Sequence, residues 1–170
     1  MSLERVSHLV FIVSALVMIG FAIDRYRGDN TRQNGVFRGA QDDPMPIGSS
    51  VGNWDAVTSG NSARTAVLVL RSTCIFCTES MPFYRQLSEF RSPERFALVV
   101  LSPEPDEVTR RYLASHSLLV DAARRHTGAE IPTRATPTLV LVDRTGRVEK
   151  SWLGKLNSDQ QEELLRRLQG

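Results

Sequence analysis

The sequence has few of the residues that build metal centres and disulfide frameworks. It contains two cysteines and three histidines in 170 residues, whereas a structural zinc site takes four ligands. His8 lies in an apolar segment, and neither His116 nor His126 is spaced to act with a cysteine or a serine, so we expect both to face solvent on helices. A domain of this length also folds without disulfide staples. We therefore expect neither a metal nor any other cofactor.

The sequence also lacks an excess of one charge. Lys and Arg number 21 against 19 Asp and Glu, and doubled arginines at 110–111, 124–125 and 166–167 suit solvated helix faces. This distribution does not favour a nucleic-acid partner. No internal repeat is present, and the length fits one globular domain with a small additional segment. We expect a monomer.

One long apolar run stands at the N-terminus. Within Val6–Ile23, only Ser14 is polar from Leu9 onward. As a helix, the whole segment would measure about 27 Å, close to the roughly 30 Å of a bilayer core. We expect residues 1–23 to form an uncleaved transmembrane anchor. A cleavable signal peptide is the competing interpretation, because Gly20 and Ala22 suit a cleavage site.

The next two parts of the chain differ in composition. Residues 24–50 are rich in Gly, Asn, Asp, Pro and Arg without a sustained period, which predicts an extended linker. Residues 51–170 alternate between apolar runs of strand length and segments of helical spacing. This pattern predicts an α/β domain.

The expected elements of the domain follow from these patterns. We expect strands at 65–71, 95–102, 138–142 and 147–152, the last two forming a hairpin. Helices are expected at 74–90, at 105–116 and after an N-cap at Asn157 or Ser158. Residues 118–126 are expected to be helical or irregular. Pro82 should bend the first helix and leave its first turn free.

Cys74 and Cys77 lie where the first strand passes into the first helix. The unpaired N–H groups of a helix N-terminus favour an anion, and the thiolate is the form of cysteine that attacks disulfides. Position i+3 returns to the same helix face, so Cys77 can form a disulfide with Cys74. We therefore expect redox chemistry in which Cys74 attacks and Cys77 resolves.

Three other interpretations of this pair are weaker. Half of a zinc site would need further ligands. A purely structural disulfide across two residues would restrain little chain entropy. Two inert buried thiols fit poorly with the polar Ser72 and Thr73 just before the pair.

The motifs together resemble the thioredoxin fold, and within it the membrane-anchored thiol-disulfide oxidoreductases of the TlpA and ResA type. The resemblance covers residues 45–170. It is carried by the strand leading into Cys74-Ile75-Phe76-Cys77, Met81-Pro82, Thr136-Pro137 and the "LVDRTGRVEKSWLG" hairpin. It implies a central mixed sheet flanked by helices, and protein thiols and disulfides as partners.

The resemblance also implies roles for single residues. Pro137 would be a cis-proline packed against the cysteines, Thr136 would pair with the substrate backbone, and Ile75 and Phe76 would contact the substrate. The chain departs from the family in Thr73, where Trp is usual, in Phe76, where Pro is frequent, and in having no acid on the strand before the motif. Because Ile75 and Phe76 supply no charge to the thiolate, we expect the protein to act on the reducing side.

Two other function classes remain open. A peroxiredoxin-like peroxidase shares the fold but carries Thr or Ser three residues before its reactive cysteine, where this chain has Arg71. A copper-handling module would combine the thiols with a histidine, and the related modules space their cysteines differently.

The same resemblance predicts on which side of the membrane the domain lies. Only Arg5 precedes the apolar run, whereas Arg25, Arg27, Arg32 and Arg38 follow it, which alone would leave the domain in the cytoplasm. Proteins with this motif on one N-terminal helix generally face the periplasm or another extracytoplasmic space, where disulfides persist. We therefore expect a single-pass protein of the cytoplasmic membrane, with its domain outside the cytoplasm.

Overall fold

The computed structural model describes residues 44–58 and 62–169. The expected anchor at residues 1–23 lies outside these residues. Among the described helices, none has both the length and the apolar character needed to cross a membrane.

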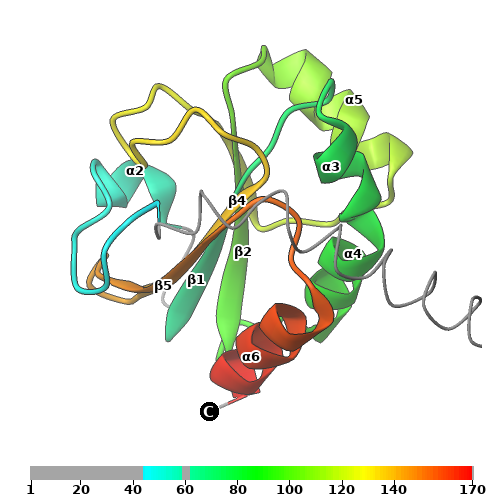
Figure 1. Ribbon diagram of the computed structural model, residues 1–170. Helices are drawn as coiled ribbons and strands as arrows, with labels where there is room; N and C mark the ends of the chain where they lie inside the picture. Colours follow the sequence, from blue (N-terminus) through cyan, green and yellow to red (C-terminus); the bar gives the residue numbers. More distant parts are fainter. Residues whose placement is uncertain (1–43, 59–61, 170) are drawn as a thin grey trace, which may run out of the picture. The chain divides into compact units, whose positions relative to one another are not determined.

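A five-stranded mixed sheet forms the centre of the described domain (Figure 1). Its strands are β1 (Arg64–Val69), β2 (Phe96–Ser102), β3 (Ala122–Arg125), β4 (Thr138–Asp143) and β5 (Val148–Leu153). They lie in the order β3-β2-β1-β4-β5. β1, β2 and β3 are parallel, and β4 is antiparallel to both β1 and β5. Every residue of β2 is buried, as its unbroken apolar run predicts.

Helices cover the sheet, which confirms the expected α/β class. They are α2 (Trp54–Val57), α3 (Ile75–Glu79), α4 (Met81–Phe90), α5 (Asp106–Ser115) and α6 (Ser158–Gln169). Alternate strand residues enter two apolar clusters, because successive side chains point to opposite faces. One cluster joins Leu68 and Leu98 to α4, α5 and α6, and the other joins Val67 and Val99 to residues 45–57. Figure 1 shows α4 and α6 together on one side of the sheet.

The end of the expected linker contacts the domain. Met45 is 4% exposed, and its backbone N–H donates to the Ser151 hydroxyl on β5 at 3.2 Å. Ser50 pairs with Arg147 in an isolated bridge. Residues 45–50 therefore pack on the sheet that the domain at 51–170 was expected to form.

The single helix expected at 74–90 is wrong, because the chain divides at Ser80 into α3 and α4. Pro82 occupies the first turn of α4 and has no N–H with which to continue the hydrogen bonds of α3. The Ser80 hydroxyl donates to the Phe76 carbonyl at 2.7 Å and closes the last turn of α3. The cysteines thus lie on a short helix of their own.

Residues 118–126 also differ from expectation, because they contain the edge strand β3. The sequence "AARR" has no β-branched or aromatic residue, so its strand conformation comes from pairing with β2 and not from propensity. His126, expected to face solvent on a helix, follows this strand and is only 9% exposed.

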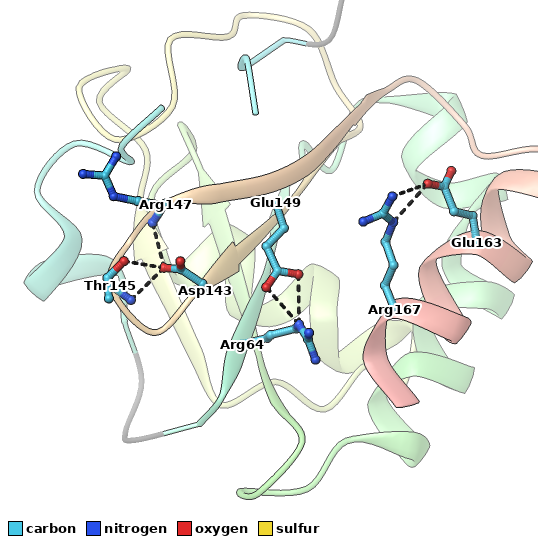
Figure 2. Close-up of polar contacts among 7 residues, drawn as sticks. All are labelled: Arg64, Asp143, Thr145, Arg147, Glu149, Glu163 and Arg167. Carbon is cyan, nitrogen blue, oxygen red and sulfur yellow. Dashed lines mark hydrogen bonds and ion pairs between the residues drawn. The ribbon is translucent and has the colours of Figure 1, made fainter. Parts of the chain in front are cut away.

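Polar contacts fix the ends of the C-terminal elements. In the hairpin turn, one carboxylate oxygen of Asp143 accepts hydrogen bonds from the backbone N–H groups of Thr145 and Arg147 and from the Thr145 hydroxyl (Figure 2). Asn157 and Gln160 exchange side-chain to backbone hydrogen bonds at 3.0 Å, which makes Asn157 the N-cap of α6. The expected hairpin and C-terminal helix are therefore confirmed.

Candidate functional site

The two cysteines lie at the carboxyl end of β1. Beyond that strand, the chain turns through residues 70–73, where the backbone N–H of Leu70 still bonds to the Leu101 carbonyl at 3.0 Å. The Glu104 carboxylate accepts from the backbone N–H and the hydroxyl of Ser72, both at 2.7 Å. Because Glu104 follows β2 and Ser72 follows β1, this contact ties together the ends of two neighbouring strands just before Cys74.

Cys74 is the N-cap of α3. Its sulfur accepts a hydrogen bond from the backbone N–H of Cys77 at 3.3 Å, and its thiol donates to the Thr136 carbonyl at 3.2 Å. Capping by a sulfur atom leaves the helix N–H directed at the group that would carry the negative charge of a thiolate. The side chain is partly exposed, whereas Cys77 is fully buried.

The two thiols therefore differ in acidity. Partial burial would raise the pKa of Cys74, but hydrogen bonds from the Cys77 thiol, the Thr136 side chain and backbone N–H groups outweigh it and hold the pKa below its ordinary value. The pKa of Cys77 is raised to about 12, mainly by burial and in smaller part by the neighbouring Cys74. Cys74 therefore reaches the thiolate form at a lower pH than Cys77, which keeps its proton near neutral pH.

The second expected part of the site lies against the first. The Thr136–Pro137 peptide bond is cis, as the sequence resemblance implied. Pro137 is buried and Thr136 is half-buried, with its carbonyl at the Cys74 sulfur. Ile75 and Phe76 are 66% and 43% exposed. The structure thus brings Cys74, Cys77 and Thr136 together and leaves the two apolar side chains between the cysteines open to solvent.

Contacts on two sides hold α3 in place. The Thr78 hydroxyl lies 3.1 Å from the Tyr112 hydroxyl of α5, and Glu79 pairs with Lys155 at 2.9 Å. Beneath the helix, Tyr84 is fully buried, and this burial raises its pKa. Its hydroxyl therefore stays protonated near neutral pH.

Sequence reasoning missed Glu104 as part of this site. The signal was present, because an acidic residue stands in "SPEP" directly after a buried parallel strand. The carboxyl ends of neighbouring parallel strands meet at one edge of a sheet, so Glu104 was bound to lie near the loop before Cys74. That Ser72 would be its partner depends on the conformation of the loop.

Solved structures share this arrangement of strands and helices. A thiol:disulfide interchange protein from Bacteroides sp. matches with a TM-score of 0.59 and 13% identity over 75% of this chain and 93% of that chain. StoA from Bacillus subtilis matches with a TM-score of 0.52 and 16% identity, over 73% of this chain and 98% of that chain. The thioredoxin domain of a thiol-disulfide oxidoreductase from Bacteroides vulgatus matches with a TM-score of 0.56 and 13% identity, over 72% of this chain and 97% of that chain. The chain has a thioredoxin-like fold.

This thioredoxin-like fold is the one that the motifs implied. No protein-family model and no curated protein matches the sequence, so the assignment rests on the arrangement of the backbone. The fold places the cysteines after β1 and the loop to Pro137 before β4, and these two strands are neighbours in the sheet. Their adjacency explains how residues 62 positions apart come into contact.

Glu104 offers a test of how the motif is held. Replacing it with Ala should lower the free energy of unfolding by about 1–3 kcal/mol, because the Ser72 N–H and hydroxyl lose a charged acceptor. The measurement is urea unfolding of the Glu104→Ala variant against the wild type. Glu107→Ala is the matched control, since it removes the same charge from an exposed position on α5 and should change little. Equal effects of the two substitutions would contradict a structural role for the Ser72 contact.

Proposed function

We propose that the protein is a thiol-disulfide oxidoreductase that exchanges disulfides with other proteins through Cys74 and Cys77. The observation that carries this proposal is that two thiols one helical turn apart differ in both exposure and acidity. Cys74 is partly exposed at a helix N-terminus with a lowered pKa, whereas Cys77 is buried with a raised pKa. Proteins with this fold that are named for disulfide interchange support the same conclusion.

In the reducing direction, which we propose for this protein, the two thiols act in order. The Cys74 thiolate attacks one sulfur of a substrate disulfide, a bond forms between the two sulfurs, and the other substrate sulfur leaves as a thiolate that takes a proton from solvent. Cys77 then gives its proton to solvent and attacks the Cys74 sulfur, which releases the second substrate sulfur as a thiolate that takes up a proton. The products are a reduced substrate and a Cys74–Cys77 disulfide, so two electrons pass from the protein to its substrate.

The apolar pair between the cysteines and the Thr136 carbonyl form the proposed docking surface. Ile75 and Phe76 expose their side chains beside Cys74, and burying them against a substrate would favour binding. They add no charge next to the sulfur, which is why we place the protein on the reducing side.

The peroxidase and copper-handling alternatives gain no support from the contacts. His126 lies against Glu130 and the Thr133 carbonyl, at 3.3 and 3.2 Å, and the His116 ring packs on Tyr112. These contacts give both rings partners other than the thiols. Arg71 remains at the position where a peroxiredoxin-like site would have Thr or Ser.

The location proposed for the domain is extracytoplasmic, with residues 1–23 as an uncleaved membrane anchor. Fusions of a periplasm-dependent and a cytoplasm-dependent reporter after Gly170 should give activity only in the periplasmic one, with the protein in the membrane fraction. Activity of the cytoplasmic reporter alone would show that the arginines after the apolar segment set the orientation.

The assigned roles of the two thiols predict different trapping behaviour. Cys77→Ser removes the resolving thiol and keeps the attacking one, so this variant should accumulate partner proteins linked through Cys74. Cys74→Ser should accumulate few, because the remaining thiol is buried and protonated. Non-reducing electrophoresis of cell extracts would show the adducts as high-mass bands that vanish on reduction.

Two results would count against these assignments. Equal trapping by both variants would contradict the order of attack. An absence of adducts from both variants, in cells where each is expressed and folded, would contradict disulfide exchange itself.

A further inference from the structure

An open pocket of about 670 Å³ lies at the carboxyl ends of the parallel strands. Arg71 follows β1, Pro103 follows β2 and His126 follows β3, and all three line the pocket. Its remaining wall includes residues 132–134 of the loop that leads to Pro137. The pocket is therefore formed by the same strand ends and the same loop that position the cysteines.

Two of the lining residues connect the pocket to the Cys74 sulfur. The Arg71 carbonyl accepts the backbone N–H of Cys74 at 3.2 Å. Arg134 lies two residues before Thr136, whose carbonyl contacts the sulfur, and two residues span at most about 7 Å. A polypeptide bonded to Cys74 would thus carry its neighbouring residues past the mouth of this pocket.

The pocket is cationic. Arg71 and Arg134 both line it, both are exposed, and none of its lining residues is acidic. Within residues 44–58 and 62–169, neither guanidinium has an ion-pair partner. By contrast, several arginines elsewhere in the domain form ion pairs. Arg64 does so with Glu149 across the sheet, and Arg167 with Glu163 on its own helix (Figure 2).

Two carboxylates adjoin the lining residues, Glu104 next to Pro103 in the sequence and Glu130 in contact with His126 and Thr127. Glu104 accepts two hydrogen bonds from Ser72. Glu130 accepts from the backbone N–H and the hydroxyl of Thr127, at 3.0 and 2.9 Å. Burial would raise the pKa of Glu130, but these hydrogen bonds and the facing His126 hold it below its ordinary value. Both carboxylates direct their oxygens at these hydrogen bonds, and in the described part of the chain neither forms an ion pair with Arg71 or Arg134.

His126 gives the pocket a fixed wall. Its side chain is 6% exposed, with Nε2 directed at the Thr133 carbonyl at 3.2 Å and Nδ1 at the Glu130 carboxylate at 3.3 Å. Because Thr133 adjoins Arg134, these contacts anchor the segment that carries one of the two guanidinium groups. The backbone that carries Arg134 is therefore held in place at the pocket.

We propose that this pocket binds a carboxylate of the substrate polypeptide, from an acidic residue close to the disulfide that Cys74 attacks. This inference rests on the proposed exchange function and adds a preference for acidic substrates. Guanidinium groups match carboxylates in planar, paired hydrogen bonds. An extended substrate advances about 3.3 Å per residue. A residue two positions from the attacked cysteine therefore lies about 7 Å along the substrate, which matches the greatest distance that two residues can place between Thr136 and Arg134.

The test uses the reduced full-length protein and three peptides that share one internal disulfide. The peptides carry Glu, Gln or Lys two positions from each cysteine and are otherwise identical. The second-order rate constant for disulfide reduction should be on the order of tenfold higher for the Glu peptide than for the Lys peptide, with the Gln peptide between them. Raising the salt to about 1 M, where the Debye length is about 3 Å, should remove most of this ratio.

Substitutions assign the preference to the pocket. In the Arg71→Gln, Arg134→Gln double variant, the ratio of Glu to Lys rate constants should fall to about twofold or less. Arg71→Lys with Arg134→Lys keeps both charges but loses the paired hydrogen bonds, and should restore part of the ratio. Arg144→Gln is the control, because this exposed arginine in the turn after β4 lies at the opposite end of that strand from the site. It should leave the ratio unchanged, and ratios within one variant also cancel any change in the reactivity of Cys74.

The possible results separate this inference from the proposed function. Rate constants that are equal for the three peptides in the wild type would overturn the acidic preference and leave disulfide exchange intact. A Glu preference that survives in the double glutamine variant would overturn the assignment to this pocket. Failure of the wild type to reduce any peptide would remove the exchange function and this inference with it.

Discussion

The hydrogen bond from the Cys77 backbone N–H to the Cys74 sulfur is the interaction on which the site depends. It requires Cys74 to stand just outside a helix and Cys77 one turn inside it, which the break at Ser80 and the short helix α3 provide. One N–H thereby stabilises charge on one sulfur, while burial opposes charge on the other. Two chemically identical side chains acquire different roles from their place on one helical turn.

The sheet supplies the rest of the site by bringing distant segments to one edge. β1 carries the chain to the cysteines, β2 delivers Glu104 to Ser72, and the loop before β4 delivers the Thr136 carbonyl to the Cys74 sulfur. The same loop and strand ends form the cationic pocket with Arg71 and Arg134. Disulfide chemistry and the proposed recognition of acidic substrates therefore depend on a single set of strand ends.

The sequence revealed those parts of the structure that follow from local patterns. The apolar run of β2, the turn at Asp143 and the two cysteines at a strand-to-helix junction each carry their signal within a few residues. β3 and the contact between Glu104 and Ser72 could not be predicted, since a polar edge strand is defined by its partner and a side-chain contact by loop conformation. His126 was misplaced for the same reason, because its burial depends on contacts with Glu130 and with the loop at Thr133.

The most direct measurement is the pH dependence of alkylation of the reduced protein by iodoacetamide, with the modified cysteine identified by mass spectrometry. Cys74 should be alkylated with a single midpoint below about 8.5, the ordinary value for a free cysteine. Cys77 should stay largely unmodified until the pH approaches its raised pKa of about 12. Alkylation of both cysteines with one shared midpoint, or of Cys77 first, would contradict the account of two thiols made unequal by one helix N-terminus.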